Sequence, residues 1–210
     1  MSPPDPIPLL ARTPVVPVLT IERVEHAVPL ARALLAGGLK VIEVTLRTRA
    51  ALEAIAAIAA QVPECVVGAG TVLGEADVAS ALAAGAKYLV SPGTTAELAA
   101  ALASAPVPAL PGCASVSEAL TLSALGFHVL KFFPAEPSGG VAWLKSVAAP
   151  CPALKFCPTG GIDLRNAAAY LALPNVIAVG GSWPAPQDAI ATGKFARITE
   201  LAREAAGLRR

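Results

Sequence analysis

One lysine stands alone in an apolar run of this 210-residue chain, and its side chain offers the most specific chemistry in the sequence. Lys131 lies in residues 129–134, where every other member is Val, Leu, Phe or Pro. Removal from water disfavours the charged form of a lysine, so burial makes the neutral amine available for attack on a ketone and formation of a Schiff base. The alternative is an outward-facing lysine that protects a sheet edge or reaches solvent.

A second run carries candidates for proton transfer and for carboxylate binding. Glu43, Thr45 and Arg47 alternate within residues 41–47 and therefore share one face of a predicted strand. Schiff-base chemistry needs a group that moves protons, and a carboxyl group beside a lysine is suited to this, although a purely structural ion pair fits the spacing equally well. Arg47 is able to hold a carboxylate through two parallel hydrogen bonds. Its position at a strand end is also typical of a solvated loop arginine.

Two glycine pairs late in the chain indicate an anion site. Residues 159–161 are Thr-Gly-Gly and residues 180–182 are Gly-Gly-Ser. Backbone N–H groups in the loops after the last two strands of a (β/α) barrel often bind phosphate, and glycine lets the backbone approach the oxygens closely. Simple tight turns are the alternative.

A repeated junction organises the elements that must position these residues. Gly38, Gly85 and Gly126 each separate an Ala- and Leu-rich segment from a β-rich run. Glycine is favoured there because the residue after a helix often adopts a positive φ. We expect helices over residues 24–36, 50–61, 75–84, 95–105 and 117–125. We expect strands over residues 15–20, 41–47, 65–72, 88–93, 108–112, 128–134, 155–161 and 176–182.

This alternation predicts an α/β fold, specifically a (β/α)8 TIM barrel that forms a single domain over residues 1–210, with residues 1–13 as a Pro-rich lead-in. A doubly wound open sheet is the alternative, but no GxGxxG follows the first strand. A closed barrel has no sheet edge, which favours an inward Lys131. Chemistry in such barrels lies at the carboxyl ends of the strands.

Composition excludes several classes of function. The chain has 16 basic and 15 acidic residues, a net charge of +1, which argues against a nucleic-acid partner. It has no strongly apolar stretch of about 18 residues and no recognisable secretory signal, so no membrane partner is expected. Four cysteines without a CxxC motif indicate buried thiols in a reducing compartment. The two histidines, His26 and His128, are too few and too far from the expected site for a catalytic triad or a histidine-rich metal site.

Motifs spread from about residue 14 to residue 206 together resemble the family of 2-keto-3-deoxy-6-phosphogluconate (KDPG) and 4-hydroxy-2-oxoglutarate (KHG) aldolases. The resemblance is carried by residues 14–18 (PVVPV), 41–48 (VIEVTLRT), 68–72 (GAGTV), 91–93 (SPG), 131–136 (KFFPAE), 157–162 (CPTGGI) and 180–183 (GGSW). It implies a class I aldolase that uses no metal and no cofactor, forms a homotrimer and is cytoplasmic. The segment after Trp183 is richer in proline than the family pattern.

The resemblance also implies roles for single residues. Lys131 corresponds to the Schiff-base lysine and Glu43 to the residue that transfers protons. The substrate-binding positions are Arg47 and Thr71 for the pyruvate carboxylate, Pro92 and Phe133 for the pocket wall, and Thr159, Gly160, Gly161, Gly181 and Ser182 toward the phosphate. The implied reactions cleave KDPG to pyruvate and glyceraldehyde 3-phosphate, and KHG to pyruvate and glyoxylate.

Two other interpretations remain open from the sequence. A sugar-phosphate isomerase or epimerase on the same barrel would use Glu43 as its base and would have no need of a buried amine. A non-catalytic protein that binds sugar phosphates and serves assembly would need neither Lys131 nor Glu43.

Overall fold

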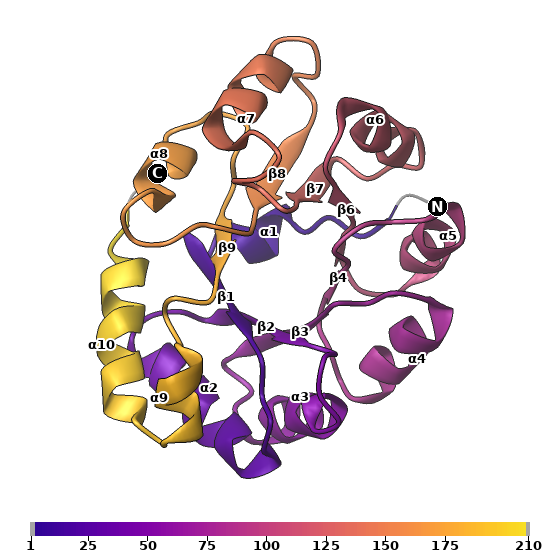
Figure 1. Ribbon diagram of the computed structural model, residues 1–210. Helices are drawn as coiled ribbons and strands as arrows, with labels where there is room; N and C mark the ends of the chain where they lie inside the picture. The colour runs from indigo at the N-terminus through magenta and orange to yellow at the C-terminus, as the bar shows by residue number, and fades with distance from the viewer. Residues whose placement is uncertain (1–2, 209–210) are drawn as a thin grey trace.

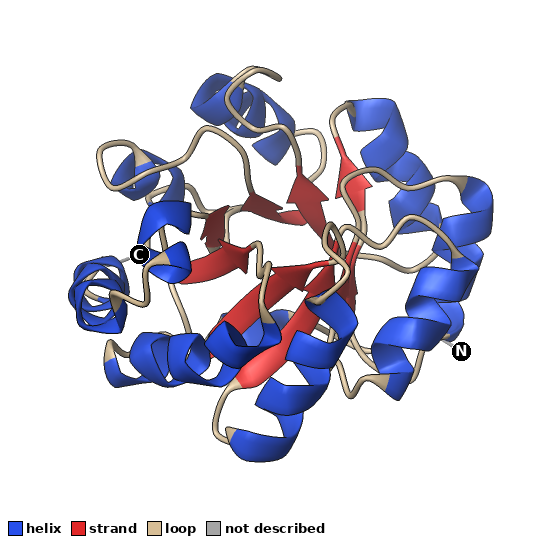
Figure 2. Ribbon diagram, turned by 60° about the horizontal axis from the view of Figure 1, so that its bottom comes forward, coloured by secondary structure: helices blue, strands red, loops and turns tan. Residues whose placement is uncertain are grey.

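Parallel strands gather round a common centre, and helices form the outer layer (Figures 1 and 2). The computed structural model describes residues 3–208, so the first two residues of the lead-in and the last two residues of the chain lie outside the described part. The strands are β1 Val15–Leu19, β2 Val41–Thr45, β3 Val66–Gly70, β4 Leu89–Val90, β5 Ala109–Leu110, β6 Gly112–Cys113, β7 Val129–Phe132, β8 Lys155–Pro158 and β9 Val179–Gly181. The parallel α/β class is confirmed.

Helices alternate with the strands along most of the chain. They are α1 Ile7–Leu10, η1 Val24–His26 (a 3-10 turn), α2 Ala27–Ala36, α3 Ala51–Gln61, α4 Glu75–Ala83, α5 Ala96–Ser104, α6 Val116–Ala124, α7 Gly140–Ala148, α8 Ala167–Leu171, α9 Gln187–Ala191 and α10 Phe195–Ala206. None of the helices within residues 3–208 has both the length and the apolar character needed to cross a membrane.

The strands fall into two parallel sheets. Within residues 3–208, one sheet has the order β5-β4-β3-β2-β1-β9 and the other has the order β6-β7-β8. Isolated parallel bridges, Phe156 to Val176 and Thr159 to Gly180, join the β8 segment to the β9 segment. On the other side, only Pro111 separates β5 from β6, and its carbonyl accepts a hydrogen bond from the backbone N–H of Lys131. The sheet is therefore strongly curled.

The apolar core has two parts. The larger part lies between the strands and the surrounding helices, and it includes Leu30, Ile55 and Phe156. A smaller cluster is formed by alternate strand residues such as Val16, Val41 and Val129, together with Leu10 from α1. Side chains alternate between the two faces of a strand. Glu43, two positions after Val41 on β2, and Lys131, two positions after Val129 on β7, therefore lie on the same inner face as this smaller cluster.

The predicted glycine junctions are confirmed. Gly38, Gly85 and Gly126 have φ values of 96°, 89° and 92°, a region that L side chains rarely adopt. Each lies after a helix and turns the chain into the next strand. Side-chain caps define other helix starts. The Ser115 hydroxyl accepts from the backbone of Glu118 while the Glu118 carboxylate accepts from the backbone of Ser115, which forms a capping box on α6.

Three sequence expectations differ from the structure in detail. The predicted strand over residues 108–112 is two short strands, because Pro111 has no N–H to donate to a ladder. Several strands end earlier than predicted, so Arg47 lies in a turn beyond β2. The Pro-rich lead-in contains a short helix that was not predicted: α1 begins after Pro6, and its Leu10 is fully buried in the inner cluster.

Candidate active site

Lys131 on β7 and Glu43 on β2 form a buried ion pair. The Lys131 Nζ donates to the Glu43 Oε1 at 3.1 Å, although the two residues are 88 positions apart in the sequence. The side chains are only 7% and 4% exposed. Each charge compensates the other in a site where an unpaired charge would be strongly destabilising. The inward orientation of Lys131 predicted from its apolar run is confirmed, and so is its proximity to Glu43.

Two glycines of β3 make room for the side chains of the site: Gly70 for the carboxylate of Glu43, and Gly68 for the ring of Tyr88. A Cβ atom on Gly70 would lie 2.1 Å from the Glu43 Oε1, and a Cβ on Gly68 would lie 2.3 Å from the ring of Tyr88. Gly68 is the ladder partner of Glu43. Sequence reasoning did not single out these glycines for a packing role, although glycine within a strand is itself a signal of close approach by another group.

Two aromatic side chains, Tyr88 and Phe133, lie near the Lys131–Glu43 pair. Tyr88 is fully buried, and within residues 3–208 its hydroxyl has no hydrogen-bond partner. Burial, and then the negative charge of Glu43, raises the pKa of Tyr88 well above its usual value, so this hydroxyl stays protonated. The ring of Phe133 lies 5.4 Å from the Lys131 Nζ, within the range of a cation–π contact.

This arrangement brings an amine and its proton acceptor within hydrogen-bond distance. Transfer of one proton from Nζ to Oε1 leaves a neutral amine beside a neutral carboxyl group. A neutral amine is the nucleophile that attacks a carbonyl carbon, and the adjacent carboxyl group is placed to return the proton to a departing oxygen.

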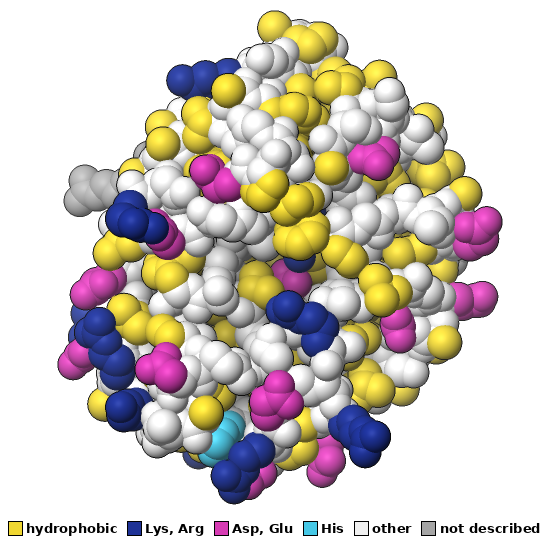
Figure 3. All heavy atoms as spheres, viewed as in Figure 1, with side chains coloured by type: hydrophobic (Ala, Val, Ile, Leu, Met, Phe, Trp, Pro, Cys, Tyr) yellow, Lys and Arg dark blue, Asp and Glu magenta, His cyan; other side chains and the backbone are white. Residues whose placement is uncertain are grey.

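A cleft of about 360 Å³ lies at the carboxyl ends of β1, β2 and β9. Its lining is Val18, Thr20, Glu22, Arg47, Ser182, Ala185, Pro186 and Gln187. Figure 3 shows a hollow at the centre of one face, with basic and acidic side-chain atoms recessed within it. Two of the predicted substrate contacts, Arg47 and Ser182, thus lie in one cleft. Arg47 is exposed, as a side chain that must reach a soluble anion would be.

Thr71 and Pro92 stand just beyond the carboxyl ends of β3 and β4. Thr71 has a φ of 60° and is the only non-glycine among residues 3–208 with a positive φ. This conformation is unfavourable for a β-branched residue and clusters at functional sites. Pro92 is held by its neighbours, because the Ser91 hydroxyl accepts from the backbone of Gly112 at 3.1 Å, and a Cβ on Gly112 would lie 2.4 Å from the Pro92 carbonyl.

The loop after β8 presents backbone N–H groups. Gly160 and Gly161 have φ values of 103° and 77°. The carbonyl of Gly160 accepts from the backbone of Glu136 and that of Gly161 accepts from the side chain of Asn166, both at 3.0 Å. Within the described part of the chain, the N–H groups of Gly160, Gly161 and Ser182 form no hydrogen bond. Backbone donors without acceptors, on a loop with positive φ values, are the kind of group that binds anions in other proteins.

Close packing also shapes the neighbouring strand ends. The Thr159 hydroxyl lies 2.2 Å from the position of a Cβ on Gly180, and the ring of Trp183 lies 1.9 Å from the position of a Cβ on Gly181. Ser182 is exposed, and Thr159 is 7% exposed. A larger residue at Gly180 would therefore displace Thr159, and one at Gly181 would displace Trp183.

Other sequence expectations fall outside this site. His128 is exposed at the amino end of β7, away from Lys131, as predicted. Cys65, Cys113, Cys151 and Cys157 are buried and form no disulfide within the described part of the chain, in agreement with their prediction as small core residues. Within residues 3–208, no group of three or more His, Cys, Asp or Glu side chains is arranged to hold a metal ion. A larger cavity of about 610 Å³, lined by Leu9, Arg12 and Lys87 among others, contains none of the predicted site residues.

A curled parallel α/β sheet with an inward lysine–carboxylate pair is the framework of an enzyme that works through a buried amine. The chain belongs to the KDPG and KHG aldolase family, whose model matches residues 7–201. It is 50% identical to the KHG/KDPG aldolase of Escherichia coli strain K12 over 197 residues, which cover 94% of this chain and 92% of that protein.

Solved structures agree with this assignment. A KDPG aldolase from Legionella pneumophila, with pyruvate captured at low pH as a covalent carbinolamine intermediate, has a TM-score of 0.95, 44% identity, and coverage of 97% of this chain and 99% of that chain. The KDPG aldolase of Zymomonas mobilis ZM4 with 3-phosphoglycerate has a TM-score of 0.90, 46% identity, and coverage of 97% and 96%. The isomerase and the non-catalytic interpretations have no support, whereas the relatives carry aldolase names.

Proposed function

We propose that this chain is a class I aldolase that cleaves KDPG to pyruvate and glyceraldehyde 3-phosphate, and KHG to pyruvate and glyoxylate, through a Schiff base on Lys131. The observation that carries the proposal is the buried contact of 3.1 Å between the Lys131 Nζ and the Glu43 Oε1. The family assignment supplies the reaction class, because its relatives are carbon–carbon lyases that carry KDPG or KHG aldolase names.

In the proposed cycle, the neutral amine of Lys131 attacks C2 of the 2-keto acid, and Glu43 donates the proton with which the oxygen leaves as water. The resulting iminium group accepts electrons. Glu43 then takes the proton of the C4 hydroxyl, and the C3–C4 electron pair moves toward the iminium nitrogen as the bond breaks. The aldehyde leaves, C3 of the enamine is protonated, and water hydrolyses the imine to release pyruvate and the free amine.

The binding roles in this proposal are those that the family resemblance implies. Arg47 and Thr71 are assigned to the carboxylate of the 2-keto acid, and Pro92 and Phe133 to the wall around C2 and C3. Thr159, Gly160, Gly161, Gly181 and Ser182 are assigned to the phosphate side. Support comes from the exposed guanidinium of Arg47 in the cleft and from the uncommitted N–H groups of Gly160, Gly161 and Ser182.

The wider organisation is also part of the proposal. We expect the two sheets to act as one closed (β/α)8 barrel in a single domain over residues 1–210. The bridges from β8 to β9, and the single residue Pro111 between β5 and β6, support closure. A cytoplasmic homotrimer is expected from the family resemblance. Light scattering of the purified protein would then give three times the chain mass of 21.1 kDa.

Borohydride trapping tests the function directly. Reduction in the presence of pyruvate converts a Schiff base into a stable secondary amine. Intact mass spectrometry should therefore show one added 1-carboxyethyl group per chain, and peptide mapping should place it on Lys131. Pyruvate without borohydride is the control. A chain that gains no adduct, or gains it on another lysine, contradicts the proposed chemistry.

A further inference from the structure

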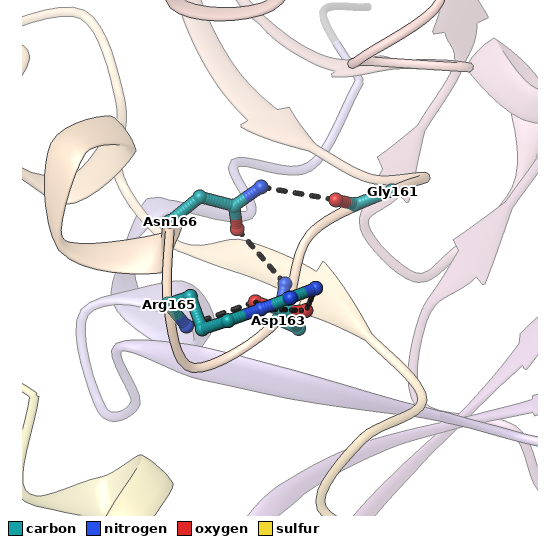
Figure 4. Close-up of polar contacts among 4 residues, drawn as sticks. All are labelled: Gly161, Asp163, Arg165 and Asn166. Atoms are coloured by element: carbon teal, nitrogen blue, oxygen red, sulfur yellow. Dashed lines mark hydrogen bonds and ion pairs between the residues drawn. The ribbon is translucent and has the colours of Figure 1, made fainter.

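The loop after β8 that contains Gly160 and Gly161 (the glycine loop) is held in place by side chains that are not among the assigned substrate contacts. The side chain of Asn166, the residue before α8, hydrogen-bonds to two backbone groups of the preceding segment (Figure 4). Its Nδ2 donates to the Gly161 carbonyl at 3.0 Å, and its Oδ1 accepts from the backbone N–H of Asp163 at 2.9 Å. The carbonyl of Gly161 is therefore occupied, while its N–H is left without a partner in the described structure.

Glu136 supports the same loop from the β7 side. Its backbone N–H donates to the Gly160 carbonyl at 3.0 Å. Its Cβ and Cγ lie 2.7 Å from the position where a Cβ on Gly161 would stand, so the side chain fills the space behind that glycine. Glycine at position 161 and the stem of Glu136 are thus two halves of one packing contact.

Tyr170 on α8 holds the carboxylate of Glu136. The Tyr170 hydroxyl donates to the Glu136 Oε1, and the Tyr170 residue is fully buried. Burial, and then the bond to Glu136, raises the pKa of Tyr170, so the hydroxyl keeps its proton and remains a donor. Gly140 gives this pair room, since a Cβ there would lie 2.8 Å from the Tyr170 oxygen.

The position of this carboxylate matters because the loop is assigned to a phosphate group. A phosphate dianion and a nearby free carboxylate repel each other, and the repulsion grows where water is partly excluded. A carboxylate fixed by Tyr170 on the α8 side of the loop cannot swing toward the N–H groups of Gly160 and Gly161. The same bond keeps the stem of Glu136 in place behind Gly161.

We propose that Asn166 and the Glu136–Tyr170 pair are positioning residues that hold the glycine loop with its carbonyls occupied and its N–H groups free, and that they thereby set the preference for phosphorylated over unphosphorylated 2-keto acids. The inference rests on the proposed aldolase function and extends it to residues that need not touch the substrate.

The test compares two substrates that differ in the phosphate. In Tyr170→Phe and Asn166→Ala, the KM for KDPG should rise about tenfold, the effect of about one lost hydrogen bond, with kcat little changed. Both parameters for KHG should stay within about twofold of the wild-type values. The concentration of inorganic phosphate that inhibits KHG cleavage should rise in parallel with the KM for KDPG.

Matched variants separate positioning from general damage. Glu136→Gln retains an oxygen that accepts from Tyr170, so it should keep a KM for KDPG close to wild type, whereas Glu136→Ala should behave like Tyr170→Phe. Asn175→Ala removes another buried amide that donates to a backbone carbonyl, that of Leu144, at 2.9 Å. Asn175 lies before β9, away from the loop, so its variant should affect the two substrates equally.

Three results would overturn the inference: equal losses on KDPG and KHG in Tyr170→Phe and Asn166→Ala, no change on either substrate, or a rise in KM for KDPG in Asn175→Ala as large as in Asn166→Ala. If Tyr170→Phe does not fold, as judged by its thermal unfolding, Asn166→Ala decides alone, because Asn166 is only partly buried. Failure of the aldolase assignment itself is distinct, since the wild-type chain would then cleave neither substrate.

Discussion

The two ends of the proposed substrate site are built from different parts of the chain. At one end, Lys131 and Glu43 project from strands and meet through side-chain atoms at 3.1 Å. At the other end, Gly160, Gly161 and Ser182 present backbone N–H groups from loops. The first end depends on which side chain is present, and the second depends on the conformation of the backbone. Substitutions should therefore damage the two ends in different ways.

Removal of the amine should produce the largest effect. Lys131→Ala leaves no nucleophile for the iminium intermediate, so kcat for KDPG should fall by at least about ten-thousand-fold, the upper range for loss of a proton-transfer group alone. Pyruvate with borohydride should add no mass to this variant. Lys155→Ala is the matched control, because Lys155 begins β8 and, among the described residues 3–208, the Lys155 Nζ donates only to the Pro174 carbonyl. Activity in Lys155→Ala near zero would contradict the assignment.

Loss of the carboxylate should come second. Glu43→Gln preserves the shape of the side chain but removes the proton acceptor 3.1 Å from Nζ. We expect kcat to fall by about a hundred- to ten-thousand-fold, with a small change in KM. Stopped-flow measurement should find slow formation of the pyruvate adduct rather than its absence. A kcat within about threefold of wild type would leave Glu43 with a structural role only.

An added methyl group at the phosphate end should act on affinity. In Gly161→Ala the new Cβ meets Glu136 at 2.7 Å in a backbone conformation of φ 77°. We expect KM for KDPG to rise about tenfold or more, from about 1–2 kcal/mol of backbone strain together with the clash, while KHG turnover changes less. Gly74→Ala is the control, because a Cβ there meets nothing within 4 Å. A fall in kcat on both substrates would erase the contrast between the two ends.

The smallest effect should follow from Ser182→Ala. This change removes a hydroxyl but keeps the backbone N–H that the phosphate would use. We expect KM for KDPG to rise by about fivefold at most, the value of one hydrogen bond, with kcat unchanged. A kcat loss comparable to that of Lys131→Ala would reverse the proposed division of roles between side chain and backbone.

The same division explains what the sequence was able to predict. Lys131 and Glu43 are visible because a charged residue in an apolar strand is unusual, and strand alternation places both on the inner face. The glycine junctions at Gly38, Gly85 and Gly126 are visible because a single residue type serves that backbone conformation. Family motifs then supplied the individual roles of Thr71 and Pro92, which composition and spacing do not distinguish from other residues at strand ends.

Other features depend on contacts between segments far apart in the chain, and local patterns do not encode them. The link from Tyr170 to Glu136 joins residues 34 positions apart, and neither is unusual in its own segment. The space that Gly70 leaves for Glu43 becomes apparent only when β2 and β3 lie side by side. The break at Pro111 was readable in principle from the missing N–H, but the apolar run on either side favoured one continuous strand.

The lysine–carboxylate pair has a consequence for how the protein acquires its activity. Glu43 belongs to the larger sheet and Lys131 to the smaller one, so the two groups meet only after both sheets have come together. Contacts of such long sequence separation form slowly and late in folding. A nascent or partly refolded chain in which only the first half has folded does not yet contain the Lys131–Glu43 pair. After denaturation, the recovery of turnover therefore reports when the two sheets come together. It should lag behind the recovery of the helical circular dichroism signal.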